Sequence, residues 1–123
     1  MRKIQKLLLF FPTLSVILAA PDTAFAECDS DIVGKWQQSH VEFAGNRIND
    51  NSQSWDFMTS GKVRFQKTNP EIDASGDYSC EGDIIYMKGS MPGRLKILTY
   101  DGDKMSWESL DHGGGITHVV RVK

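Results

Sequence analysis

The sequence is short of helical periodicity, long apolar segments and clustered basic charge. No apolar repeat with helical spacing is sustained over about ten residues after Ala26, which argues against a helical core. The longest mostly apolar run, Leu7 to Ala20, is broken by Pro12 and falls short of the ~20 residues of a membrane-spanning helix. The net charge is −2 and no basic cluster occurs. This balance argues against nucleic acid and anionic membrane surfaces as partners.

Patterns that carry enzymatic chemistry are also missing. No Cys-x-x-Cys occurs, and no set of Ser, His and Asp stands at a strained nucleophile turn. Most carboxylates stand in predicted turns, where they serve turn geometry. The glycine run Gly113–Gly115 joins two predicted strands, so it does not open a helix that could hold a phosphate. We therefore expect a non-catalytic protein without a cofactor.

Residues 1–26 have the pattern of an export signal. Basic residues precede the apolar run, and Ala24-Phe25-Ala26 supplies the small-x-small step that signal peptidase cuts. We expect cleavage after Ala26, which places residues 27–123 in the periplasm or outside the cell as one domain. Glu27 precedes Cys28 where a lipoprotein would have a small residue, which argues against a lipid anchor.

The mature chain contains two cysteines, Cys28 and Cys80. An even pair in an oxidising compartment usually forms a disulfide. Closing a loop of about 50 residues would stabilise the fold by about 4 kcal/mol on the chain-entropy model. We expect a bridge that ties the start of the mature chain to the middle of the sheet. A redox or metal-binding pair is the alternative.

Short β-rich runs bounded by Gly, Asn, Asp or Pro recur after Ala26 and predict eight strands joined mostly by tight turns. The predicted strands cover residues 34–43, 55–59, 62–68, 75–81, 84–88, 94–100, 104–110 and 116–123. The polar stretch Arg47–Ser54 is a predicted linker. Such strands without a long crossover close naturally into a barrel. We expect an all-β, eight-stranded antiparallel up-and-down barrel, with an open sandwich as the alternative.

Alternation of apolar and polar residues identifies the expected buried face. The first strand is out of phase, because Trp36 and Phe43 are separated by an odd number of positions, and a bulge near Ser39 or His40, or a bend, would reconcile them. The expected inward set is Trp55, Phe57, Val63, Phe65, Ile84, Tyr86, Leu95, Ile97, Met105, Trp107, Ile116 and Val120.

The two ends of the domain carry a family resemblance. Ile32-Val33-Gly34-Lys35-Trp36 heads the first strand, and Val119-Val120-Arg121 lies in the last. This pairing resembles the lipocalins, in which a Gly-x-Trp opens the barrel and a late arginine packs over the tryptophan. Intervening segments such as Trp55-Asp56-Phe57 and Gly76-Asp77-Tyr78 look like the small bacterial lipocalin-like domain family. The resemblance implies a closed barrel and structural roles for Gly34, Trp36 and Arg121.

We expect the ligand site in the open mouth of the barrel, at the end opposite Trp36, and a small apolar or amphipathic molecule as its ligand. The expected lining residues are Trp55, Phe57, Phe65, Tyr86 and Trp107. The mature chain has no predicted integral membrane segment, and we expect it to be a monomer.

A second resemblance leaves another function open. Tyr78-Ser79-Cys80-Glu81-Gly82 resembles the Tyr-x-Cys-x-Gly strand of the periplasmic C-type lysozyme inhibitors, which are also small disulfide-bearing β-barrels. Their Ser-Gly-x-Arg-Tyr loop has no match here. The alternative is therefore a periplasmic protein-interaction barrel, an inhibitor or immunity-type factor, that uses the loops Arg47–Ser54 and Asp111–Gly115.

Metal binding is a third possibility, because periplasmic copper carriers use sets of histidine and methionine. His112 and His118 flank the glycine turn and are the candidate ligands, and methionines could add soft donors. Scattered methionines more often fill gaps in a core, so we expect no resident metal.

Overall fold

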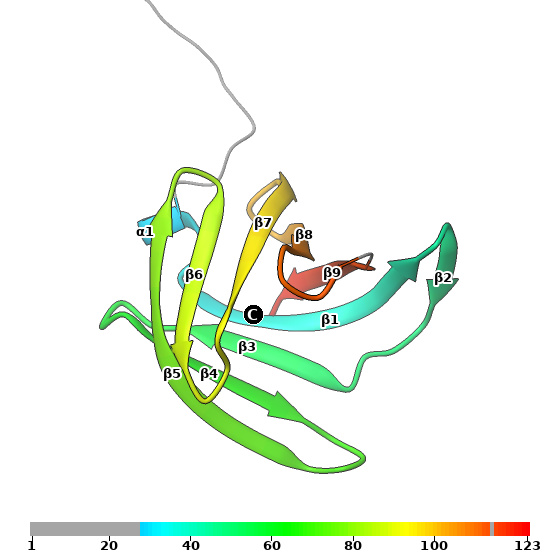
Figure 1. The fold of residues 1–123 in the computed structure, drawn as a ribbon, viewed down its shortest axis with the longest axis horizontal. Coiled ribbons are helices and arrows are strands. Elements are labelled where there is room, and N and C mark those ends of the chain that lie inside the picture. The colour runs from blue at the N-terminus through cyan, green and yellow to red at the C-terminus, as the bar shows by residue number, and fades with distance from the viewer. Residues whose placement is uncertain (1–27, 114) are drawn as a thin grey trace, which may run out of the picture.

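The computed structural model describes residues 28–113 and 115–123, with the backbone alone for Cys28 and Asp29. The predicted signal peptide lies outside this part of the chain. The described residues form one helical turn followed by nine strands, and Figure 1 shows how these elements are arranged. Their bounds are α1 Cys28–Asp31, β1 Gly34–Phe43, β2 Asn46–Ile48, β3 Gln53–Phe57, β4 Lys62–Lys67, β5 Ile72–Glu81, β6 Ile84–Gly89, β7 Gly93–Tyr100, β8 Lys104–Ser109 and β9 Gly115–Arg121. Within the described ranges, no helix has the length and apolar character needed to cross a membrane.

The strands form one antiparallel sheet that closes on itself. Each strand from β3 to β8 pairs with the next one along the chain, β3 also pairs with β1, and β1 pairs with β9. β1 and β3 to β9 therefore make a closed eight-stranded barrel with an additional strand, β2. This arrangement confirms the predicted fold class.

β2 lies in the stretch that was expected to be a polar linker. It pairs with the far end of β1, where Val41 lies opposite Ile48. β3 pairs with β1 only over Gly34–Gln37. β2 therefore supplies hydrogen-bond partners for the end of β1 that β3 does not reach. Ala44 and Gly45 between the two strands both have positive φ, 52° and 81°, as a tight type I′ hairpin turn requires. In Figure 1 this β1–β2 hairpin extends away from the rest of the barrel.

β1 and β9 form the seam that closes the barrel. Their pairing begins with Trp36 opposite Arg121 and shifts register between Gln38 and His40. The shift confirms the bulge that was predicted near His40. Trp36 and Gln38 lie on the same face of β1 before the bulge, and both are buried. After the bulge, Val41 lies opposite Thr117 of β9. The extra residue of the bulge therefore changes which positions of β1 face the interior, from even-numbered to odd-numbered ones.

The barrel interior is filled with apolar side chains. The predicted inward face is confirmed on β3, β4, β7 and β8, where the buried apolar residues are Trp55, Phe57, Val63, Leu95, Ile97, Met105 and Trp107. Phe65 is partly buried and packs against this core.

On β6 the predicted face was wrong. Ile85 is fully buried and Met87 packs against the core, whereas Ile84 and Tyr86 are only partly buried. Ile85 lies opposite Leu95 on β7, which is also buried. Because all four residues from Ile84 to Met87 are apolar or aromatic, alternation alone could not show which pair faces the interior.

On β9 the predicted face was also wrong. Ile116 and Val120 were expected inside, but Val119 is the buried residue and lies opposite Met105. Residues two positions apart share a face of a strand, so Thr117 and Arg121 face inward with Val119. The polar side chains of this set made the opposite face look like the buried one.

The end of the barrel near α1 is closed by Trp36 and Arg121. Trp36 is fully buried, and the guanidinium carbon of Arg121 lies 4.3 Å from its ring centroid. The guanidinium also donates hydrogen bonds of 2.7 Å to the backbone carbonyls of Asp31, Val33 and Gly102. Gly34 has φ +128°, and a Cβ there would lie 2.8 Å from Nη1 of Arg121. Glycine at this position therefore gives the arginine room to cover the tryptophan.

The predicted Cys28–Cys80 bridge lies only partly within the described residues. Cys80, on β5, packs against the core, and no free cysteine occurs among the described residues. α1, which contains Cys28, packs against β5. The side chain of Cys28 is outside the description, so the pairing stays a prediction that this packing supports.

Candidate functional site

A cavity of about 410 Å³ occupies the end of the barrel away from Trp36. We call it the mouth cavity. Its lining residues are Gln53, Trp55, Phe65, Ile72, Ala74, Met87, Ser90, Met91, Leu95, Trp107, Ser109, His112 and Thr117. They come from β3 to β9 and from the loops after β6 and β8. In an up-and-down barrel every second connection lies at the same end, so the loops after β6 and β8 share one end. The β7–β8 turn lies at the opposite end, where Arg121 donates a hydrogen bond to Gly102. The cavity is therefore the open mouth of the barrel.

Three aromatic rings form one wall and the floor of the mouth cavity. The ring of Trp55 packs edge-on against Trp107 with 5.0 Å between centroids, and it lies 5.3 Å from the ring of Phe65. Trp107 and Trp55 are only 2% and 8% exposed. Edge-to-face packing of this kind holds the rings in fixed orientations, so the aromatic wall is preformed.

The polar groups of the mouth cavity are few and mostly neutral. The polar residues that line it are Gln53, Ser90, Ser109, His112 and Thr117. Of the lining residues that the structure describes, none is Asp, Glu, Lys or Arg. Such a lining can orient a ligand by hydrogen bonds without compensating a full charge on it.

An ion pair holds the loop that carries His112. Asp111 accepts hydrogen bonds from the backbone N–H of Arg94, at 2.8 Å, and from its guanidinium, at 3.0 Å. These bonds to Arg94 hold the pKa of Asp111 below its ordinary value. The backbone N–H of His112 donates to the hydroxyl of Ser109 at 3.1 Å. These contacts tie the β8–β9 loop to β7 and β8 at the rim of the mouth.

Large apolar side chains stay exposed around the mouth. Phe43 and Ile48 on the β1–β2 hairpin are 54% and 49% exposed, and Ile72 at the start of β5 is 41% exposed. Val41 lies opposite both Ile48 and the inward-facing Thr117, so Phe43 and Ile48 share the face of the hairpin that continues the barrel interior. The entrance to the cavity therefore has an apolar rim.

The structure brings together three of the five residues that were expected to line the mouth. Trp55, Phe65 and Trp107 line the cavity. Phe57 is fully buried beneath it, with its ring 6.3 Å from Trp107 and 5.2 Å from Tyr78. Tyr86 does not line it, because the reversed phase of β6 turns this side chain to the outer face.

Several lining residues were missed by sequence reasoning. Met87 and Thr117 were missed because the phases of β6 and β9 were assigned in reverse. Met91 and His112 lie in loops, where no periodic pattern indicates a direction. The register of the barrel was needed to place them.

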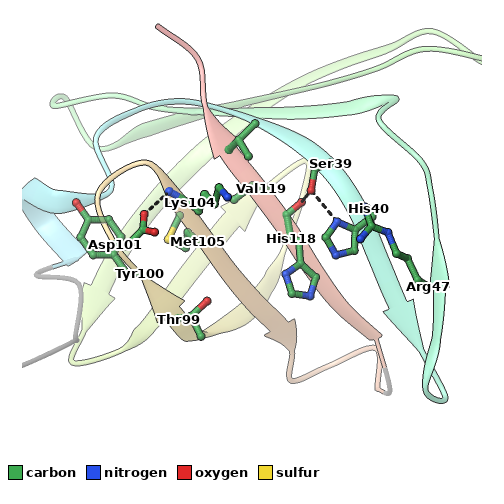
Figure 2. Close-up of a pocket in the computed structure, with 11 residues that line it drawn as sticks. Ser39, His40, Arg47, Thr99, Tyr100, Asp101, Lys104, Met105, His118 and Val119 are labelled. Atoms are coloured by element: carbon green, nitrogen blue, oxygen red, sulfur yellow. Dashed lines mark hydrogen bonds between the residues drawn. The ribbon is translucent and has the colours of Figure 1, made fainter.

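A second pocket, of about 510 Å³, lies on the outer surface of β1, β9, β8 and the end of β7 (Figure 2). We call it the outer groove. Two register shifts border it, one between Gln38 and His40 and one between Ile97 and Thr99. Thr99, which lines the groove, shares a hydrogen bond of 2.6 Å between its hydroxyl and that of the buried Ser106.

Two histidines of the outer groove stack across the seam. His40 and His118 lie opposite each other, with ring centroids 4.1 Å apart and planes 10° from parallel. Nearly parallel rings direct their nitrogens along parallel lines, not toward one metal ion between them. His112 lies in the mouth, so the two candidate metal ligands are on different surfaces, and the described residues contain no group of three or more His, Cys, Asp or Glu that could hold a metal.

No family model matches the chain, and no curated protein matches it.

Proposed function

We propose that this chain is an exported, non-catalytic, lipocalin-like binding protein that holds a small, apolar, uncharged molecule in the mouth cavity. The observation that carries this proposal is the preformed cavity with an aromatic wall and no Asp, Glu, Lys or Arg among its described lining residues. Its volume of about 410 Å³ falls in the range of ~300–1,000 Å³ that small-molecule sites occupy.

The arrangement of the two ends of the barrel supports the lipocalin-like assignment. Gly34, Trp36 and Arg121 come together at the closed end, which is the role that the resemblance implies for them. With that end plugged, the mouth is the entrance to the interior. The exposed Phe43 and Ile72 near its entrance add apolar surface there, and Ile72 also lines the cavity.

Filling the cavity from within gives a direct test. Ala74 lines the cavity, whereas the next residue, Ser75, is exposed on the outer face of the same strand. Ala74→Phe should therefore occupy the ligand volume, and Ser75→Phe is the matched control. The neutral dye N-phenyl-1-naphthylamine serves as the probe, with its own fluorescence and the quenching of the protein's tryptophan fluorescence as readouts.

We expect saturable dye binding to the native protein and to Ser75→Phe, and at least about tenfold weaker binding to Ala74→Phe, equivalent to ~1.4 kcal/mol. Equal binding by the two variants, or no saturable binding by the native protein, would exclude the mouth as the site. Urea unfolding of both variants shows whether the barrel is intact.

Export is tested separately. The mature protein recovered from the producing cell should begin at Glu27, as measured by intact mass. A chain that still begins at Met1 in the cytoplasm would show that residues 1–26 are not a cleaved signal.

A protein-interaction barrel is the second candidate, and the exposed hairpin favours it. Phe43 and Ile48 project from a strand pair that extends beyond the barrel, and such residues also serve as anchors in protein interfaces. Native mass spectrometry of the protein from its own compartment separates the two functions. A retained small molecule supports the binding protein, and a co-purifying protein lost in Phe43→Ser supports the interaction barrel.

A further inference from the structure

Only one of the two stacked histidines of the outer groove has an acidic hydrogen-bond partner among the described residues. Nε2 of His118 lies 2.7 Å from Oε1 of Glu42, and because a carboxylate only accepts, the imidazole donates this hydrogen bond. The ring of His40 lies on the other side of the His118 ring, 4.1 Å away. Glu42 thus serves His118, and His40 has no carboxylate partner among the described residues.

The hydrogen bond of His40 leaves its other ring nitrogen, Nε2, without a partner among the described residues. Nδ1 lies 2.8 Å from the hydroxyl of Ser39, which itself lies 3.4 Å from the carbonyl of His118. When the hydroxyl donates to that carbonyl, it accepts from Nδ1–H of His40. Nε2 is then a bare acceptor in the neutral ring and becomes a donor when the ring is protonated.

Arg47 brings a permanent positive charge to the same place. It stands on β2, and Figure 2 shows its side chain extending toward the His40 ring. Its Nε donates to the side chain of Asn49 at 2.9 Å. Its two terminal nitrogens have no hydrogen-bond partner among the described residues, so both can donate parallel hydrogen bonds to the oxygens of one oxyanion, as a fork.

The charges around His40 disfavour a cation there. Burial lowers the pKa of His40, the neighbouring His118 and Arg47 lower it further, and Glu42 acts in the opposite direction. Farther along the groove Lys104 adds a positive charge. Asp101 also lines the groove, but its carboxylate accepts from two backbone amides of its own turn at 2.7 and 3.0 Å.

We propose that the outer groove binds an oxyanion, the carboxylate, sulfate or phosphate group of a small molecule, between the imidazole of His40 and the guanidinium of Arg47. The bound anion accepts from the arginine fork and from the protonated Nε2 of His40. It supplies the counter-charge that His40 lacks, so binding takes up one proton. The site is on the outer surface and does not depend on a ligand in the mouth.

Histidine NMR signals of the purified protein test this site. Sulfate and acetate are the probes, and sulfate keeps its charge over the range of about pH 5 to 8 in which histidine titrates. A saturable shift of the His40 signal by either anion, with an increased pKa of His40, supports the proposal. Above the pKa of His40 in the free protein, anion affinity should fall about tenfold per pH unit, since each binding event requires one proton.

Charge variants distinguish anion binding at this site from the general attraction of anions to a positively charged surface. Arg47→Gln should weaken binding by at least about tenfold, whereas Lys88→Gln, which removes an exposed charge from the outer face of β6, should leave it unchanged. His40→Asn should remove the pH dependence. The proposal is overturned if neither anion shifts the His40 signal, if the two charge variants bind equally, or if His40→Asn keeps the pH dependence.

Discussion

Replacing Arg121 measures how strongly the closed end of the barrel is held. Arg121→Met keeps the apolar stem over Trp36 and removes the guanidinium. Stacking of a guanidinium on tryptophan contributes ~0.5–2 kcal/mol, and each of the three hydrogen bonds to backbone carbonyls contributes ~1 kcal/mol net. The free energy of unfolding should therefore fall by about 3–5 kcal/mol, a large part of the ~5–15 kcal/mol of a small domain.

Urea unfolding followed by tryptophan fluorescence gives this free energy for a two-state domain. Lys123→Met is the matched control, because Lys123 pairs with Asp103 at 2.7 Å with side chains 73% and 66% exposed. Loss of such a surface pair should change stability by at most about 1 kcal/mol. If Arg121→Met costs no more than Lys123→Met, the guanidinium does not hold the closed end. If Arg121→Met does not fold, Arg121→Lys is compared with Lys123→Met in its place, because lysine keeps the positive charge but lacks the planar guanidinium.

A double-mutant cycle shows whether Arg121 acts through the tryptophan. Trp36→Phe shortens the ring under the guanidinium and removes the hydrogen bond of 2.8 Å from Nε1 to the carbonyl of Ile32. Combined with Arg121→Met it should give a coupling energy of about 0.5–2 kcal/mol. Additive effects would mean that the arginine acts on the three carbonyls alone.

Three further changes test other parts of the fold. Reducing the predicted bridge between Cys28 and Cys80 should lower the free energy of unfolding by about 4 kcal/mol; an unchanged denaturation midpoint would show that the cysteines are not paired. Gly76→Ala should destabilise by about 1–3 kcal/mol, because its Cβ would overlap the backbone of β6, whereas Gly113→Ala, with open space around it, should be neutral in thermal unfolding. Two backbone amides hold the pKa of Asp101 below its ordinary value, so its stabilising effect is present at neutral pH and is lost on acidification below about pH 4. Asp101→Asn should flatten the decline in stability over that range, and an unchanged acid titration would contradict this assignment.

The order of strands could be predicted from sequence because turns and alternation are local properties. Asp101 marks the β7–β8 turn, and Met105 and Trp107 alternate with polar residues beyond it. β2 could not be predicted in the same way. Its three residues are polar or exposed, and it exists because β1 is longer than β3 and leaves backbone groups to be paired.

The faces of β6 and β9 could not be predicted, because each depends on a partner strand. Ile84 and Ile85 are equally apolar, and only the pairing with Leu95 places Ile85 inside. On β9 the interior takes a polar residue at each end, Thr117 in the mouth and Arg121 over the tryptophan. The aromatic wall of the candidate site was therefore predictable, whereas its polar lining and the histidine stack required the register.

The short strand β2 also has a consequence for how copies of this protein behave in solution. A projecting strand with unpaired backbone groups is a template for strands of other molecules, and this leads to aggregation. β1 is paired with β9 on one side and with β3 and β2 on the other. The backbone edge left on the hairpin is only three residues long and contains Arg47 at its centre. The hairpin can therefore expose apolar side chains to a binding partner, while its short free edge offers few backbone groups for fibril growth.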